Sequence, residues 1–413
     1  MPANLPSVTL QISAASYQKT LAESLLDAGM LRQAIDTVPY LEIREPNGNG
    51  QLERVKNFPV FTMSKRIAWG VWRRLPAKLR PLPPVTPTVW LADRLVAKWI
   101  APSKIFHGCT ALCLASLSTA KKQGAITLVE HAACHPRDWK NVEQEECQKF
   151  GMNSDDGSGN QPERLLDRME QEFKECDRIV APSGVAQESF GAHGYGKKTV
   201  VVPTGVDAEF FSPVGEDAPP PIFRVCYVGR IEAAKGVGYL LRAWKQLSLP
   251  SAELLLVGEV KPHMETMLKQ YSTCGVRLAG VLPPREVAKC YRESSLFVLP
   301  SPIEGLAQVL LEAMASGLAV VATDRTGAKD CISDGKEGRI VPTREVDALA
   351  EAILWCYQHA EKTREMGKAA RERIEREFTL EHYNQRVMAL YRSLAGAVVT
   401  AERTHTLPKT GEG

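Results

Sequence analysis

The chain has 413 residues, 44% of them apolar, so it is long and apolar enough to bury two cores rather than one. Its 51 lysines and arginines nearly balance its 48 acids, and the resulting net charge of +3 argues against a globally basic nucleic-acid-binding protein. The ten cysteines form no framework of close pairs and the first residues contain no cationic leader, so we expect reduced thiols and a cytoplasmic location.

Short apolar segments alternate with longer helix-compatible stretches through the first half of the chain. In chain order the predicted strands are VTLQI, KIFH, ITLV, RIVAP and TVVVP, all before residue 204. This alternation is typical of a parallel sheet with helices on both faces. Prolines and acids then dominate residues 211–222, which we interpret as a linker.

A second series of strands follows the linker, with the segments FRVCYVG, ELLLVG, LFVLP, LAVVAT and GRIVP. From about Asp347 to Leu394 the sequence predicts consecutive helices, with a break at Phe378-Thr379-Leu380. The predicted fold class is therefore α/β with two doubly wound domains. We place the first domain at residues 1–212, the second with its terminal helices at 213–400, and a disordered tail at 401–413.

Residues 62–104 are basic and rich in tryptophan. They contain nine Lys or Arg residues and Asp93 as their one acid, interleaved with Trp69, Trp72, Trp90 and Trp99. This composition is typical of a segment that lies on an anionic membrane surface. Prolines at 76, 81, 83, 84 and 87 interrupt any long helix, so a basic loop that packs its tryptophans inward is the alternative.

Histidines follow two of the predicted strands of the first domain. His107 ends KIFH, and His131 follows ITLV, with His135, Arg137 and Asp138 shortly after it. A ring with a tunable pKa suits an active-site position, although each histidine also suits a structural role. Three cysteines lie near them, but the spacing of the combined set matches no common zinc module, so we expect no metal site there; the three are Cys109, Cys113 and Cys134.

The strongest motif is LPSPIEGLAQVLLEAMASGLAVVAT, residues 299–323, which predicts a strand, a loop with Glu304-Gly305, and a helix that begins near Leu306. Ligands of such sheets bind outside the carboxyl ends of the strands, and a helix N-terminus there favours a phosphate. Glu312 is eight residues after Glu304, about 12 Å away if the spacing is helical. A hydroxyl-rich ligand would give the carboxylate inside VLLEAMA a partner. The alternative is one glutamate that caps the loop and another on an exposed helix face.

Two cations follow the first strand of the second domain. Gly229-Arg230 ends FRVCYVG, and Lys235-Gly236 directly precedes the helical stretch VGYLLRAWKQL. The planar guanidinium of Arg, which can donate two parallel hydrogen bonds, and the compact ammonium of Lys can together neutralise the charge of a diphosphate. Alternatively, each is an ordinary solvated charge in a loop.

Together these motifs resemble the family-4 retaining glycosyltransferases of the GT-B fold. The resemblance is carried by VVPTGVDAEFFSP (201–213), YVGRIEAAKG (227–236), LLLVGEV (254–260) and the continuous segment 276–342, and the spacing Glu304-x7-Glu312 is the family's signature. It implies two Rossmann-like domains that face each other across a cleft, with C-terminal helices returning to the N-terminal domain.

The resemblance also implies a nucleotide-sugar donor on the C-terminal domain and an acceptor on the N-terminal domain. Arg230 and Lys235 would bind the donor diphosphate, Glu304 the sugar hydroxyls and Glu312 the ribose. The implied catalytic set is Glu304, His131, Arg230 and Lys235; the implied donor-binding set is Gly229, Arg230, Lys235, Glu304, Gly305, Leu306, Ala307, Gln308 and Glu312. The implied reaction retains anomeric configuration, uses no metal and no separate cofactor, and transfers to a sugar, lipid-linked or small-molecule acceptor in surface glycan or glycolipid synthesis.

Two positions depart from the family's pattern. The first strand runs into Ala14-Ala15-Ser16-Tyr17 where members usually have a glycine-rich loop, and Ala307 stands where many have glycine. Two other functions are compatible with this architecture, a nucleotide-sugar epimerase and a catalytically silent nucleotide-sugar-binding protein. The presence of both cations and both glutamates favours transfer.

Overall fold

The computed structural model describes residues 5–12, 16–36, 55–57, 85–152, 162–213, 222–271 and 275–405. Within them the chain forms two compact units. The first comprises the described residues of the ranges 1–131, 162–180 and 383–413, and the second comprises those of 132–161 and 181–382. Residues 132–161 and 181–212, which the sequence assigns to the first domain, therefore group with the second unit. The domain boundary at residue 212 stays a prediction.

The first sheet has seven strands in the order β3-β2-β1-β4-β5-β6-β7. The bounds are β1 Val8–Ile12, β2 Leu31–Asp36, β3 Val55–Asn57, β4 Ile105–Cys109, β5 Ile126–Glu130, β6 Arg178–Ala181 and β7 Thr199–Val201. Pairing is parallel from β3 through β6, with His107 of β4 opposite Leu128 of β5. All five strands predicted in this half are present.

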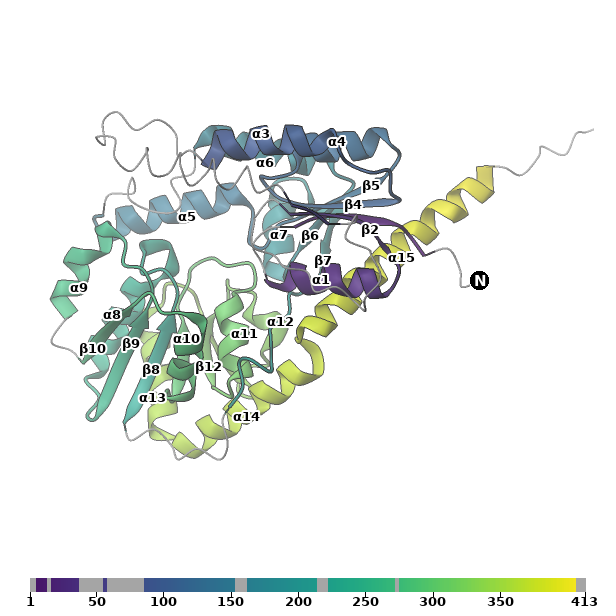
Figure 1. Ribbon diagram of the computed structural model, residues 1–413. Helices are drawn as coiled ribbons and strands as arrows, with labels where there is room; N and C mark the ends of the chain where they lie inside the picture. The colour runs from purple at the N-terminus through teal and green to yellow at the C-terminus, as the bar shows by residue number, and fades with distance from the viewer. Residues whose placement is uncertain are drawn as a thin grey trace, which may run out of the picture. The chain divides into compact units, whose positions relative to one another are not determined.

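Helices cover both faces of the first sheet (Figure 1), as the sequence pattern predicts. One face carries α3 (Val85–Ala97), α4 (Leu114–Lys122) and α6 (Glu163–Glu175), and the other carries α1 (Ser16–Asp27) and α15 (Leu380–His405). The ring of Tyr383 on α15 meets that of Tyr17 on α1 edge to face, with centroids 5.1 Å apart. The terminal helix therefore returns to the N-terminal unit, as the resemblance implies.

α15 is anchored by two fully buried tyrosines that bond to polar groups of the first sheet. Tyr383 Oη donates to Glu130 Oε1 (2.9 Å), and the hydroxyl of Tyr391 lies 2.6 Å from His107 Nδ1. Burial raises the pKa of Glu130 and lowers that of His107 to about 4. His107 is thus a buried neutral ring that helps hold a helix.

The second sheet has six parallel strands in the order β10-β9-β8-β11-β12-β13. The bounds are β8 Phe223–Val228, β9 Ala252–Val257, β10 Val276–Gly280, β11 Leu296–Leu299, β12 Val320–Thr323 and β13 Gly338–Val341. Alternate residues of each central strand enter two separate apolar cores. Cys226 and Phe297 lie in one, and Val225 and Leu296 in the other. A strand buried on both faces reads as a continuous apolar run, which is why these strands were recognisable.

The remaining elements of the second unit are helices, and those from Val237 onward contribute buried residues to these cores. They are α5 Pro136–Lys149, α7 Gly184–Ala192, η4 Gly196–Lys198, η5 Ala233–Lys235, α8 Val237–Leu247, η6 Pro262–Met264, α9 Glu265–Tyr271, α10 Pro284–Arg292, α11 Gln308–Ala315, α12 Ala328–Cys331, α13 Val346–Gln358 and α14 Ala360–Glu377. The break between α14 and α15 falls at Phe378-Thr379, as predicted. α15 itself extends to His405, into the segment for which the sequence predicts a disordered tail, and residues 406–413 lie outside the described residues.

Three strands, β2, β3 and β10, were not predicted. β2 (LRQAID) carries polar residues inside the sheet, and Gln33 is buried because its amide bonds to Trp99 O (3.0 Å) and Ala101 N (2.9 Å). β10 lies at the sheet edge, where Leu278 is 47% exposed. Neither shows the apolar run on which the prediction depended.

Candidate functional site

The candidate site lies where the strand order of the second sheet reverses. β8 and β11 are neighbours, but their chain connections lead to opposite edges of the sheet, so the loops after these two strands leave an opening. The loop after β8 carries Arg230 and Lys235, and the loop after β11 carries Glu304. Both predicted motifs therefore share one crevice of the fold.

Lys235 and Glu304 meet directly at this switch point. Lys235 Nζ forms an ion pair with Glu304 Oε1, and both side chains are largely buried, with 16% and 12% exposed. The ammonium also lies 4.5 Å from the centroid of the Trp139 ring on α5. A ligand that brings a diphosphate to Lys235 and hydroxyls to Glu304 would replace this internal pair with two partners of matching polarity.

The two loops are held close by a glycine. Gly236 has φ +69°, and a Cβ at this position would stand 2.0 Å from the carbonyl oxygen of Pro300. Only glycine permits this approach, because any side chain would collide with backbone. The glycine after the lysine thus fixes where Lys235 stands against the loop of Glu304.

Arg230 is the more accessible cation. Its side chain is 46% exposed, and its Nε lies 3.1 Å from Glu232 Oε1. The preceding Gly229 continues the sheet, since its N–H donates to Val257 O (2.9 Å). A half-exposed guanidinium beside a buried carboxylate retains donors for an incoming anion.

The loop of Glu304 is packed through its backbone. Cys134 Sγ donates to Glu304 O (3.2 Å), and Ser183 Oγ donates to Gly305 O (2.7 Å). A Cβ on Gly305 would lie 2.6 Å from Ala133 Cα, so the absence of a side chain at this glycine permits the loop to lie close to protein backbone. The loop can therefore present only backbone and the Glu304 side chain to a ligand.

The helix after this loop begins later than predicted. α11 starts at Gln308 with Ala307 as its N-cap residue, because residues 304–307 are still irregular, so the 12 Å estimate for Glu304 to Glu312, which assumed helical spacing, does not apply. Ala307 provides no side-chain cap for the first N–H groups of α11. Leu306 and Ala307 are buried in the core, and Gln308 Nε2 donates to Gly205 O (2.9 Å). Their backbone, rather than their side chains, is what a ligand could contact.

Glu312 is a partly buried carboxyl with one protein partner in the described residues. Tyr291 Oη donates to Glu312 Oε2 (3.1 Å), and burial raises the pKa of Glu312 to about 7. Tyr291 itself is fully buried on α10. The sequence analysis missed Tyr291, and also Trp139, because nothing in the pattern around an isolated aromatic indicates its partner.

The histidine candidates separate into different environments. The backbone N–H of His131 donates to Val180 O (3.0 Å), which continues the pairing of β5 and β6, and its half-buried ring meets Phe173 edge to face. His135 is fully buried at the N-cap of α5, and its ring stacks on His193 at 3.7 Å. His135 therefore caps the N-terminus of α5. His131 belongs to the first unit and the donor candidates to the second, so its catalytic role stays a prediction.

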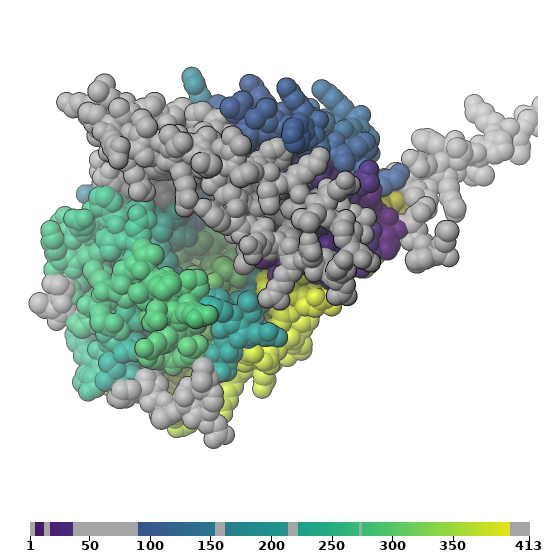
Figure 2. Space-filling view, in the orientation of Figure 1, coloured from purple at the N-terminus to yellow at the C-terminus, as the bar shows by residue number. Residues whose placement is uncertain are grey.

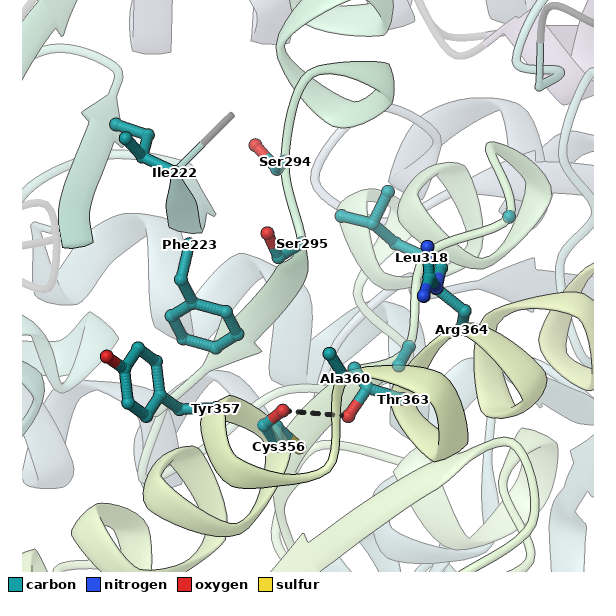
Figure 3. Close-up of a pocket in the computed structure, with 12 residues that line it drawn as sticks. Ile222, Phe223, Ser294, Ser295, Leu318, Cys356, Tyr357, Ala360, Thr363 and Arg364 are labelled. Atoms are coloured by element: carbon teal, nitrogen blue, oxygen red, sulfur yellow. Dashed lines mark hydrogen bonds between the residues drawn. The ribbon is translucent and has the colours of Figure 1, made fainter. Parts of the chain in front are cut away.

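A cavity of about 290 Å³ in the second unit lies elsewhere (Figure 3). It is lined by residues that precede or begin β8, β11 and β12, including Phe223, Ser295 and Ala319. The ring of Tyr357 meets Phe223 edge to face at 5.2 Å. Because the carboxyl ends of these strands are at the opposite edge, this cavity is separate from the crevice of Lys235 and Glu304.

Comparison with known proteins shows which families this sequence and fold are similar to. Residues 222–359 match the family described as glycosyl transferases group 1. The α-maltose-1-phosphate synthase of Mycolicibacterium smegmatis is 32% identical over 207 residues, which cover 46% of this chain and 52% of that protein. The chain spans about half the length of the curated relatives it matches most strongly.

Solved structures extend the likeness to the whole fold. Sucrose-phosphate synthase from Thermosynechococcus elongatus has a TM-score of 0.68 at 20% identity, covering 95% of this chain and 100% of that one. HepE from Anabaena, solved in complex with UDP, has a TM-score of 0.63 at 16% identity, covering 94% and 99%. The predicted fold class is thereby confirmed: the chain has the GT-B fold, and its residues 222–359 match the group 1 glycosyltransferase family.

Proposed function

We propose that the protein is a retaining glycosyltransferase that moves a sugar from a nucleotide-sugar donor to an acceptor hydroxyl. The observation that carries this proposal is the Lys235–Glu304 pair at the switch point of the second sheet, with Arg230 beside it. A cation can bind a phosphate and a carboxylate can accept hydrogen bonds from hydroxyls. Side by side, the two groups match the two halves of a sugar diphosphate. The complex of HepE with UDP supports a nucleoside diphosphate as part of the donor.

In this proposal each group has a separate task. Lys235 and Arg230 bind the diphosphate and stabilise the charge that develops on it as the glycosidic bond breaks. Glu304, released from Lys235, accepts hydrogen bonds from sugar hydroxyls, and Glu312 accepts them from the ribose. The two cations take the place that a metal ion would otherwise have, so we propose that the chemical step needs no metal and no further cofactor.

The acceptor would bind through the first unit, with His131 as the residue nearest the sugar. A half-buried imidazole with one ring face against Phe173 can accept or donate a proton without a large rearrangement. The acceptor class is a sugar, a lipid-linked compound or a small molecule, and the product belongs to surface glycan or glycolipid synthesis.

The donor site is tested by a screen and three substitutions. A preferred nucleotide sugar raises the unfolding temperature by mass action, so UDP-, GDP- and ADP-sugars are compared by thermal shift. Glu304→Gln, Arg230→Ala and Lys235→Ala should each lower turnover at least about a hundredfold while the protein stays folded. Lys289→Ala, an exposed lysine paired with Glu293, is the matched control and should retain wild-type turnover. Near wild-type rates in any two of the three would remove the assignment.

The same assay separates transfer from the alternatives. An epimerase interconverts free or nucleotide-linked sugars without an acceptor, whereas a transferase releases nucleoside diphosphate only when an acceptor is present. A silent binding protein shows the thermal shift and no turnover. Activity in excess chelator should match that of the untreated enzyme, and a requirement restored only by magnesium or manganese would contradict the proposed mechanism.

We further propose that the first unit meets an anionic membrane through α3. Leu91, Leu95 and Trp99 recur every four residues and are 59%, 48% and 55% exposed, with the exposed cations Arg94 and Lys98 between them. The part of the chain that includes α3, blue in Figure 2, lies at the molecular surface. The acid of this segment is turned inward, since Asp93 is fully buried and bonds to Ser116 Oγ (2.7 Å). An outward face with apolar and cationic side chains complements an anionic bilayer surface.

Much of the basic segment cannot contribute to this argument, because residues 62–84 lie outside the described residues. Among the residues that the structure describes, no helix combines the length and apolar character needed to cross a bilayer. The proposal is therefore limited to the exposed face of α3 and the turn that follows it.

A further inference from the structure

A cluster of metal-ligating side chains lies in the second unit, outside the donor residues. Glu143 and Cys147 are one helical turn apart on α5, and His263 comes from η6. One ligand atom of each residue lies within 4.8 Å of the other two. Glu143 and Cys147 are buried and His263 is half-buried.

A further carboxyl group, that of Glu232, adjoins this cluster. Glu232 is fully buried, and in the described part of the chain its Oε2 makes no hydrogen bond, while Oε1 faces Arg230 Nε at 3.1 Å. Glu143 and Cys147 are buried as well, and Cys147 Sγ lies 4.0 Å from Glu143 Oε1. Several acidic groups crowded into a buried place repel one another, and a divalent cation would relieve this.

The chemistry of the set selects the cation. Thiolate, imidazole and carboxylate are together the usual ligands of Zn²⁺, while Mg²⁺ and Ca²⁺ prefer oxygen. Three protein ligands leave a position for water or for the nearby Glu232. We propose that Glu143, Cys147 and His263 form a Zn²⁺-binding site. Binding forms the zinc–sulfur bond and releases the thiol proton of Cys147 to solvent.

Zinc at this site would act on the turn that carries Lys235. Two successive N–H groups of η5 donate into the cluster: Ala233 N to His263 Nε2 (3.2 Å) and Ala234 N to Glu143 Oε2 (3.1 Å). Glu143 can ligate through Oε1 and keep its bond through Oε2. His263 cannot do the same. If Nε2 binds zinc its lone pair is used, and if Nδ1 binds zinc then Nε2 carries the proton.

Either way the buried Ala233 N–H loses its acceptor when zinc binds. A buried N–H without a partner is costly, so η5 shifts, and Lys235 moves with it. Zinc is therefore an inhibitor of donor binding, and donor binding weakens zinc binding by the same factor. This consequence rests on the proposed function, whereas the metal site itself does not. The chemical step still uses no metal.

Cobalt provides a readout that does not depend on activity. Co²⁺ alone, titrated into the full-length protein with its thiols reduced, should bind with one-to-one stoichiometry and give the near-ultraviolet charge-transfer band of a cobalt–thiolate bond. Cys147→Ser should abolish the band, and His263→Gln should weaken binding at least tenfold. Cys290→Ser, a half-buried cysteine outside the cluster, is the matched control and should retain the full band. Thermal unfolding of each variant establishes that it is folded.

Absence of the band in the wild type, or an equal band in Cys147→Ser, would overturn the site. If folding fails in Cys147→Ser, His263→Gln decides, because His263 is half-buried whereas Cys147 is buried. The coupling has its own test: Zn²⁺ should raise the KM for the nucleotide sugar at least fivefold in the wild type and leave it unchanged in Cys147→Ser. An unchanged KM in the wild type, with the cobalt band present, would refute the coupling and leave the site standing.

Discussion

The pKa of Glu312 makes the proposed ribose contact testable by pH alone. Burial raises this pKa to about 7, and the hydrogen bond from Tyr291 lowers it in part. If only the carboxylate accepts bonds from the ribose, donor affinity is full above the pKa and is lost as pH falls through it. For a pKa near 7 the ionised fraction is about 90% at pH 8 and about 10% at pH 6, so the dissociation constant of the donor should rise about ninefold over that range.

The assay is calorimetric titration with the preferred nucleotide sugar at pH 6.0 to 8.5, in steps of about half a unit. Glu312→Gln should bind weakly at every pH with no midpoint near 7. Tyr291→Phe removes a bond that favours the charged form, so its midpoint should move to higher pH.

Glu143 is the matched control because its pKa is also raised to about 7 and it lies near Lys235. Glu143→Gln should retain the midpoint. A midpoint that persists in Glu312→Gln and vanishes in Glu143→Gln would refute the assignment of Glu312 and move the effect to the η5 turn.

Three further predictions concern packing and the membrane. Gly305→Ala should lower the free energy of unfolding by about 1–3 kcal/mol in chemical denaturation, since a Cβ would lie 2.6 Å from Ala133 Cα. Gly396→Ala is the control and should not destabilise the protein, because a Cβ there would have no neighbouring atom within 4 Å. Equal losses of stability in the two variants would contradict the close packing at Gly305. Tyr391→Phe should cost about 1–3 kcal/mol because it leaves the buried His107 Nδ1 without its hydroxyl partner, and an unchanged denaturation midpoint would count against the anchoring of α15. Co-sedimentation of the protein should be strong with anionic vesicles at low salt and weak with neutral vesicles or at about 1 M salt. Combined serine substitution of Leu91, Leu95 and Trp99 should reduce it. Equal binding to both vesicle types would indicate an ordinary protein surface.

The parallel strands and the chemical motifs were readable from the sequence because they follow local rules. A strand such as FRVCYVG is apolar throughout since both of its faces enter a core, and its identity requires no knowledge of its neighbours. Glu304, Gly305 and Arg230 stand out since they directly follow such strands. Where polar residues are buried by specific partners, as Gln33 is in β2, the local pattern is misleading.

The sequence alone determined that two strand–helix series exist, which residues end their strands, and that the motifs resemble one family. The tertiary structure decided which side chains meet. Lys235 pairs with Glu304 because β8 and β11 become neighbours at the reversal of strand order, although 68 residues intervene between the two side chains. Glu143 on α5 and His263 on η6 both bond to the η5 turn, although no sequence spacing connects the two residues. Strand identity depends on the burial of a few consecutive residues, whereas these contacts depend on the order in which whole strands add to the sheet, and that order is set by packing over the entire domain.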